Sequence, residues 1–302
     1  MFTSYSYKKK ILAALLIFGA LSAWPMYTVF VPSTQKKLML FNAPQTQQQI
    51  QATITEIATA STVADTLAQE LNAEHDRLLA ELQKAFPMQQ EWTETLEEIE
   101  QLKAEDTLLC ENPVVNNAAD DHEIVKKARA LLAEYSINPE IVRVFTSDNP
   151  KRLTSAAAGQ GYDGKKLIHD LEINLAQITK RSPEAQDAIL RHEIMHLLHY
   201  DGLEQAAIEA MFARNTIAEK DYSRNPAFMA YCRQQEYRAD LLAASYGIAI
   251  AQAAQKDFEQ FMSEYPEIAK RESVRHPSLE QRHHAVSQLA SYMQAEKQTI
   301  AA

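Results

Sequence analysis

The chain has 302 residues, of which 46% are hydrophobic, so it can bury one substantial core and a smaller module. Its formal net charge of −10 at pH 7 argues against nucleic-acid binding and against broad adhesion to anionic lipid surfaces. Only six glycines in a sequence rich in Ala, Leu, Glu and Gln predict a mainly helical protein. Two cysteines, Cys110 and Cys232, are too few for a disulfide scaffold, and the sequence leaves their pairing open.

The N-terminal segment, residues 1–31, determines the predicted compartment. Three lysines at positions 8–10 precede an apolar stretch from Ile11 to Val31. This stretch is either a secretory signal peptide cut near Ala20–Ala23 or an uncleaved signal anchor. Its length, about the 20 residues that span a membrane, favours the anchor. Both interpretations export the rest of the chain, either anchored in the inner or plasma membrane or released as a periplasmic or secreted protein.

Residues 32–112 are predicted to form a helical module. From Thr46 to Phe86, isoleucines and leucines recur at helical spacings, and Pro87 ends the pattern. Gln89 to about Glu105 forms a second candidate helix. The two helices predict an antiparallel hairpin that packs on the following domain. A coiled-coil surface for a partner and a pro-segment that covers the active site remain alternatives.

Residues 113–302 are predicted to form a metallopeptidase domain, which a polar break at 112–121 separates from the helical module. The domain begins with a helix from Asp121 to Tyr135. Candidate strands follow at residues 141–145, 156–159 and 166–174. The expected fold class is therefore mainly α with a small β-sheet, an α+β protein.

An H-E-x-x-H motif runs from His192 to His196 inside a strongly helical segment. Residues four apart differ by only about 40° around a helix, so both imidazoles can reach one Zn²⁺. Glu193 points elsewhere on the helix and can activate a water molecule without binding the metal. Ser182 is a predicted N-cap for this helix, and Gly202 is a predicted C-cap.

A catalytic zinc site usually needs a third protein ligand. His199 lies on the same stripe as His192, but about 10 Å further along the axis, so it cannot share the metal. Glu236 and Asp240 lie on one face of a second predicted helix, from Phe228 to about Tyr246. One of these carboxylates can bind zinc while the other accepts the distal N–H of a ligand histidine.

The sequence resembles the HtpX and CAAX prenyl protease family of zinc endopeptidases, including its periplasmic BepA-like members. The resemblance covers about Ile141 to Ala290. It rests on the motif at residues 192–196, on Glu236-Tyr237-Arg238-Ala239-Asp240, and on His276-Pro277-Ser278 with Arg282 four residues later. Prenyl proteases and HtpX proteins carry several membrane spans that this chain lacks after residue 31. It is therefore similar to the short, exported type of member.

The resemblance implies a zincin-like domain that binds one Zn²⁺ per chain. The implied metal ligands are His192, His196 and Glu236. It also implies that Asp240 orients a ligand histidine without touching the metal. In such proteins a small sheet flanks the active-site helix, and its edge binds extended substrate. We place that edge at residues 156–159.

These assignments predict a zinc endopeptidase that hydrolyses peptide bonds in exported or membrane-associated proteins. Glu193 is the expected general base, and His276 is expected near the substrate carbonyl, where it could stabilise the oxyanion. Alternatively, His276 only belongs to the cap of a helix that starts near Pro277. Two rival functions remain: a non-hydrolytic zinc-binding chaperone or assembly factor, and an exported interaction protein that uses the helical module. The sequence leaves the substrate and the oligomeric state open.

Overall fold

A computed structural model describes residues 47–110, 113, 122–163 and 165–301. The predicted signal or anchor segment at residues 1–31 lies outside the described residues, as does most of the polar break at 112–121. None of the helices in the described ranges combines the length and apolar content that crossing a bilayer requires.

The described chain is mainly helical and contains one three-stranded sheet, which confirms the α+β class. The helices are α2 (Gln47–Ala85), α3 (Gln89–Glu105), α4 (Glu123–Glu134), α5 (Leu175–Ile178), α6 (Pro183–His199), α7 (Asp201–Arg214), α8 (Glu219–Tyr222), α9 (Pro226–Ala244), α10 (Ile248–Glu264), α11 (Pro266–Ala269) and α12 (Leu279–Ala301). The strands are β1 (Val142–Ser147), β2 (Ala156–Tyr162) and β3 (Leu167–Asn174). The predicted helices and strands are therefore present, with their ends shifted by a few residues.

The sheet has the order β1-β3-β2, so β2 is an edge strand. β1 runs parallel to β3, with Val142 opposite His169, whereas β2 runs antiparallel to β3, with Ala158 opposite Leu171. Alternate residues of β3 are buried, as expected for a strand with one face on a core. This face packs on the apolar side of α6, where Leu190, Ile194 and Leu197 are fully buried.

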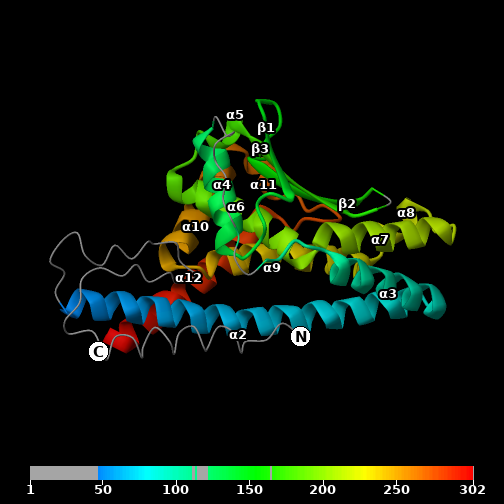
Figure 1. Ribbon diagram of the computed structural model, residues 1–302, viewed down its shortest axis with the longest axis horizontal. Coiled ribbons are helices and arrows are strands. Elements are labelled where there is room, and N and C mark those ends of the chain that lie inside the picture. The colour runs from blue at the N-terminus through cyan, green and yellow to red at the C-terminus, as the bar shows by residue number, and fades with distance from the viewer. Residues whose placement is uncertain (1–46, 111–112, 114–121, 164, 302) are drawn as a thin grey trace.

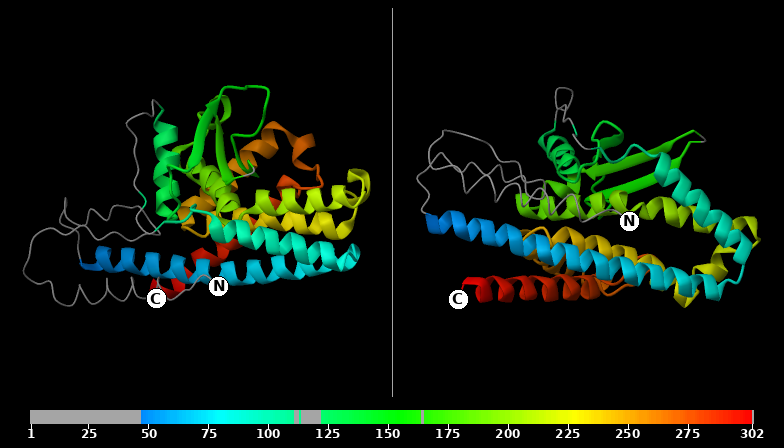
Figure 2. Two further views of the ribbon diagram at one scale, coloured as in Figure 1. Left: turned by 45° about the vertical axis from the view of Figure 1, so that its right-hand side comes forward. Right: turned by 60° about the horizontal axis from the view of Figure 1, so that its bottom comes forward.

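The elements form layers around the helix that carries the H-E-x-x-H motif. Figure 1 shows the sheet on one side of α6 and α9, and the long helix α2 on the opposite side. The other views show the same order, with α12 beside α2 (Figure 2). α6 contacts both the sheet and α9, and α9 in turn contacts α2. The layout leaves α6 and α9 side by side in the middle of the molecule.

α2 and α3 form a helical hairpin that packs on the rest of the chain, α2 against α9 and α12 and α3 against α7 (Figures 1 and 2). Leu82 of α2 and Trp92 of α3 are buried against Phe212 and Tyr231. The indole N–H of Trp92 donates to the backbone oxygen of Phe86 at 2.8 Å, which satisfies the polar atom of this buried ring. The apolar stripe that the sequence predicts on α2 is thus the face that packs against the rest of the chain.

The predicted start of α6 is confirmed, but its predicted end is wrong. Ser182 is the N-cap, and its hydroxyl accepts a hydrogen bond from the Ala185 amide at 3.2 Å. The helix ends at Tyr200, which adopts a left-handed conformation with φ of 58°. Gly202 is not a cap, because it lies inside α7. A Cβ there would stand 3.3 Å from the Gln160 amide nitrogen, so the glycine allows α7 to approach β2 closely.

Candidate metal centre

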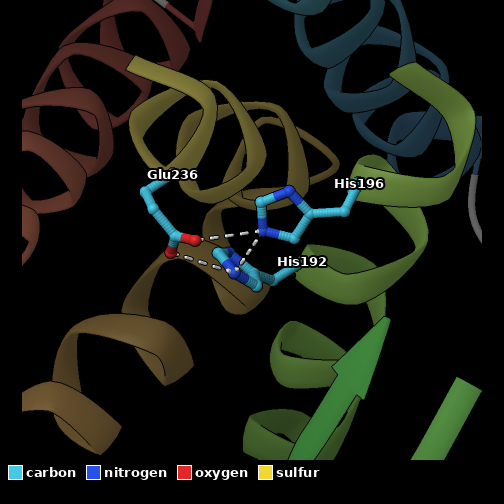
Figure 3. Close-up of side chains that lie close together, drawn as sticks. All are labelled: His192, His196 and Glu236. Carbon is cyan, nitrogen blue, oxygen red and sulfur yellow. Dashed lines mark hydrogen bonds and ion pairs between the residues drawn. The ribbon is translucent and has the colours of Figure 1, made fainter. Parts of the chain in front are cut away.

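Two helices bring the three predicted metal ligands together. His192 and His196 project from α6, and Glu236 projects from α9 toward them (Figure 3). One ligand atom of each residue lies within 4.8 Å of the others. The two imidazole Nε2 atoms are 3.0 Å apart. The Glu236 oxygens lie 3.6 Å from His192 Nε2 and 3.5 Å from His196 Nε2.

Buried packing fixes where the two helices stand. α6 presents Ile194 and Leu197 to the sheet, and α9 buries Ala239 and Ala243 in the same core. The small residues of α9 allow its backbone to lie close to α6, which brings a carboxylate within reach of the imidazoles. The side chains at the centre are only slightly exposed, with 13% for His192. A site of this kind is partly desolvated and still reachable from solvent.

His196 is held by a second carboxylate on its other ring nitrogen. Its Nδ1 lies 2.7 Å from Oδ2 of Asp201, whose other oxygen pairs with the buried guanidinium of Arg238. Burial alone would lower the pKa of His196, but the contact with Asp201 and the charge of Glu236 raise it to about 9. Burial would raise the pKa of Asp201, but the charge of Arg238 outweighs this and lowers it.

His192 has an equivalent partner in Asp240. Its Nδ1 lies 2.8 Å from Oδ1 of Asp240. Arg282 binds the same carboxylate with two parallel hydrogen bonds, from Nε at 2.6 Å and from Nη2 at 2.7 Å. Burial would raise the pKa of Asp240, but the charges of Arg282 and His192 lower it. The predicted placement of Asp240 beside a ligand histidine agrees with this geometry.

Glu236 stays ionised although it is buried. Nη1 of Arg282 lies 3.2 Å from its Oε2, and Nδ1 of His276 lies 3.1 Å from its Oε1. Burial disfavours the charged form, but Arg282 and His276 favour it more strongly and hold the pKa of Glu236 well below its usual range. An ionised carboxylate is the form that binds a metal cation.

The donor atoms fit a zinc ion. A carboxylate next to each Nδ1 favours a proton on that nitrogen, so in the neutral form of each ring the Nε2 lone pair faces the other imidazole and Glu236. Electron-rich atoms so close together need a cation or a proton between them. Ligands about 2.1 Å from one tetrahedral Zn²⁺ stand about 3.4 Å apart, close to the separations found here. Two imidazoles and one carboxylate are also a usual catalytic zinc set.

Glu193 lies beside the three ligands without belonging to them. Its Oε2 accepts a hydrogen bond of 2.7 Å from the backbone amide of Ala158 in the edge strand β2. This contact places the carboxylate between the metal ligands and the sheet edge. The position is the one that a general base needs if a peptide lies along that edge.

The structure also gives the positions of His276, His199 and the two cysteines. His276 is 58% exposed and lies in the segment before α12, with its side chain against Glu236. His199 lies one turn beyond His196 and takes no part in the group of metal-binding atoms found among the described residues. Partial burial and the charge of Arg238 lower the pKa of His199 to about 3, so the ring is neutral at pH 7. Cys110 and Cys232 are both free thiols.

A cleft of about 840 Å³ opens onto the centre. Its walls come from the start of β2, from α6, α9 and α10, and from the segment between α11 and α12. No residue of the described hairpin helices lines it. A volume of this size suits a peptide segment or a drug-sized molecule.

Sequence reasoning missed Asp201 as the partner of His196. On a continuous helix, a residue five positions after His196 would point away from the metal. The left-handed turn at Tyr200 brings it back toward His196. The pairing of Arg238 with Asp201 was missed for the same reason. Arg282, noted only as part of a motif, joins Asp240 and Glu236.

Comparison of the chain with protein-family models, with curated proteins and with solved structures found no significant match. The site is therefore interpreted from its own geometry and chemistry.

Proposed function

We propose that the protein is a zinc-dependent endopeptidase. The observation that carries this proposal is the convergence of two imidazoles and one carboxylate on one point, with the carboxylate of Glu193, which is not one of these three groups, next to them in an open cleft. A purely structural zinc site is usually closed by four protein ligands, whereas three ligands leave a position for a water molecule. A site that only binds metal also has no use for a base.

The proposed roles of the residues follow from their positions. A bound Zn²⁺ would polarise the scissile carbonyl and make a water molecule more acidic. Glu193 would accept a proton from the attacking water and later deliver it to the leaving amine. His276, exposed at the mouth of the cleft, would donate a hydrogen bond to the developing oxyanion. Asp201 and Asp240 would hold the two imidazoles in the tautomer that binds metal.

The proposal includes the arrangement around the site. We propose a zincin-like fold for residues 113–302, with extended substrate pairing along residues 156–159 of the edge strand β2. We also propose that residues 1–31 export the catalytic unit, either as an anchor in the membrane or as a cleaved signal peptide. The substrates would then be exported or membrane-associated proteins.

Digestion of casein by the purified protein tests the proposal. We expect the wild type to cleave casein, and we expect a zinc chelator to stop the reaction. Glu193→Gln should keep one zinc per chain and lose about 10²- to 10⁴-fold in rate, because it removes only the base. Glu184→Gln, an exposed carboxylate in the first turn of the same helix, should leave the rate unchanged.

Two results would contradict the proposal. One is wild-type protein with full zinc that cleaves neither casein nor a peptide library, which would favour a binding or chaperone role. The other is unchanged turnover in Glu193→Gln, which would remove this residue from the mechanism.

A further inference from the structure

One part of the cleft, here called the branch, is lined by apolar side chains of α6, α9 and α10. Its walls are built from Ala188, Ile189, Ala243, Ala254, Phe258 and Phe261. The alanines keep the space open, and the two phenylalanines leave part of their rings uncovered in it. Binding is favoured when an apolar side chain displaces water from an apolar cavity.

The branch begins next to the metal centre. The guanidinium of Arg282 lies 5.4 Å from the centroid of the Phe258 ring and 3.2 Å from Oε2 of Glu236. Ile189 stands one helical turn before His192 on α6. A side chain that enters the branch must therefore belong to a residue next to the bond that is cleaved.

The branch contains one buried polar pair, Arg181 and Asp257. Arg181 precedes α6, and its Nε lies 3.1 Å from Oδ1 of Asp257 on α10, with its side chain only 5% exposed. Nη1 of Arg181 is buried and lacks a hydrogen-bond partner among the described residues, whereas Oδ1 of Asp257 is paired with Nε of Arg181. Nη1 therefore needs an acceptor. A buried donor of this kind is normally satisfied, so its partner is expected to come from a ligand.

We propose that this branch is a specificity pocket that binds an aromatic side chain flanking the cleaved bond, and that it selects tyrosine. The ring fills the apolar space between α6 and α10. The phenol oxygen accepts a hydrogen bond from Nη1 of Arg181, which satisfies this donor, and its O–H donates to the neighbouring carboxylate of Asp257. This inference rests on the proposed peptidase function, since it names the substrate that the same cleft would accept.

Decapeptides with one variable residue in an alanine–glycine background test the proposal. The variable residue is Tyr, Phe, Leu or Ala. Cleavage is measured by mass spectrometry with the wild type, and binding is measured by fluorescence anisotropy with metal-free Glu193→Gln. We expect Tyr to exceed Ala by about 10-fold or more in both measurements, because a large side chain is buried. Tyr should exceed Phe by about 3- to 10-fold, the value of one hydroxyl with buried partners.

Two variants of α10 localise the effect. Ala254→Leu adds three carbons to the wall of the branch and should reduce binding of the Tyr peptide about 10-fold. Ala249→Leu makes the same change on the exposed side of the helix and should leave binding unchanged. Arg181→Met should bring the Tyr and Phe peptides to equal affinity, and circular dichroism verifies that this variant is folded.

The outcomes separate this inference from the proposed function. Cleavage without preference for aromatic residues, or equal binding of all four peptides, overturns the pocket and leaves the peptidase intact. Absence of cleavage contradicts the peptidase, while selective binding to the Glu193→Gln protein still supports the pocket. Equal affinity for Tyr and Phe in the wild type overturns the role of Arg181 and Asp257.

Discussion

At the scale of single residues, the centre is built from pairs of opposite charge behind each metal ligand. Asp201 stands behind His196 and is neutralised by Arg238, and Asp240 stands behind His192 and is neutralised by Arg282. These contacts orient both rings before a metal arrives, and they keep the buried carboxylates ionised.

The two carboxylates behind the histidines should therefore control zinc affinity. Asp201→Asn and Asp240→Asn should each weaken zinc binding about 10- to 100-fold, because an amide orients the imidazole less strongly. Competition with a chromogenic chelator measures the change. Asp170→Asn, which breaks the exposed pair with Arg143 on the sheet, is the matched control and should keep wild-type affinity. Equal zinc affinity in all three variants would show that the carboxylates do not tune the site.

At the scale of helices and strands, a buried ionic cluster joins the α2–α3 hairpin to α7 and α9. The carboxylate of Glu204 on α7 lies 3.1 Å from His75 of α2 and 2.8 Å from Lys103 of α3, and it accepts a hydrogen bond of 2.9 Å from Tyr231. Burial would raise the pKa of Glu204, but His75 and Lys103 outweigh it and hold the pKa far below its usual range.

This lowered pKa makes the stability of the protein depend on pH. Ionised Glu204 contributes its full stabilisation above its unfolded pKa of about 4.3, and the contribution is lost as the pH falls from there toward the lower folded pKa. Glu204→Gln should lower the free energy of unfolding by about 2 kcal/mol at pH 7. The stability of this variant should also depend less on pH between pH 5 and pH 3 than that of the wild type. Urea unfolding at several pH values measures this.

Glu97→Gln, on the exposed face of α3, provides the control for the same experiment. It should keep the pH dependence of the wild type. If both variants had the same free energy of unfolding as the wild type at every pH, the cluster would contribute nothing to the docking of the hairpin.

The elements show what could be predicted from the sequence and what could not. Apolar spacing predicted the hairpin helices, and the Ser182 cap predicted where α6 begins, because both signals are local. The end of α6 was misplaced because Tyr200, a non-glycine residue, adopts a left-handed conformation. That conformation depends on tertiary contacts, including the hydrogen bond from its hydroxyl to Asp106 at 2.9 Å.

The same reasoning explains the partial prediction of the site. Helical spacing predicted that His192 and His196 share a metal, and it placed Glu236 and Asp240 on one face of a second helix. The resemblance to zinc endopeptidases then implied Glu236 as the third ligand, which lies beside the two imidazoles. The contacts of Asp201 and Arg238 depend on a turn and on a packing angle that no local pattern encodes. The Arg181–Asp257 pair joins a loop to α10 and has no sequence signal at all.

At the scale of the whole molecule, the hairpin and the cleft occupy different parts of the surface. The described hairpin residues pack against α7 and α9 and do not line the cleft, so in this arrangement they support these helices without covering the candidate metal centre. The metal ligands join α6 to α9, the two helices at the centre of the layers (Figures 1 and 3).

Metal removal should therefore destabilise the entire domain. A ligand present at about 1,000 times its dissociation constant adds about 4 kcal/mol to the folded state. Stripping zinc with a chelator should lower the Tm by about 10 °C in a chain of this size. Calorimetry with and without the chelator measures the shift. Glu236→Ala should show a much smaller shift, and an unchanged Tm in the wild type would mean that the metal does not bridge the helices.

The most direct measurement of the central claim is the anomalous X-ray signal of zinc in crystals of the full chain. We expect one peak, about 2.1 Å from His192 Nε2, from His196 Nε2 and from a Glu236 oxygen. Glu236→Ala crystals should show a peak of clearly lower occupancy at the same place. A zinc peak elsewhere, or full occupancy without Glu236, would contradict the account.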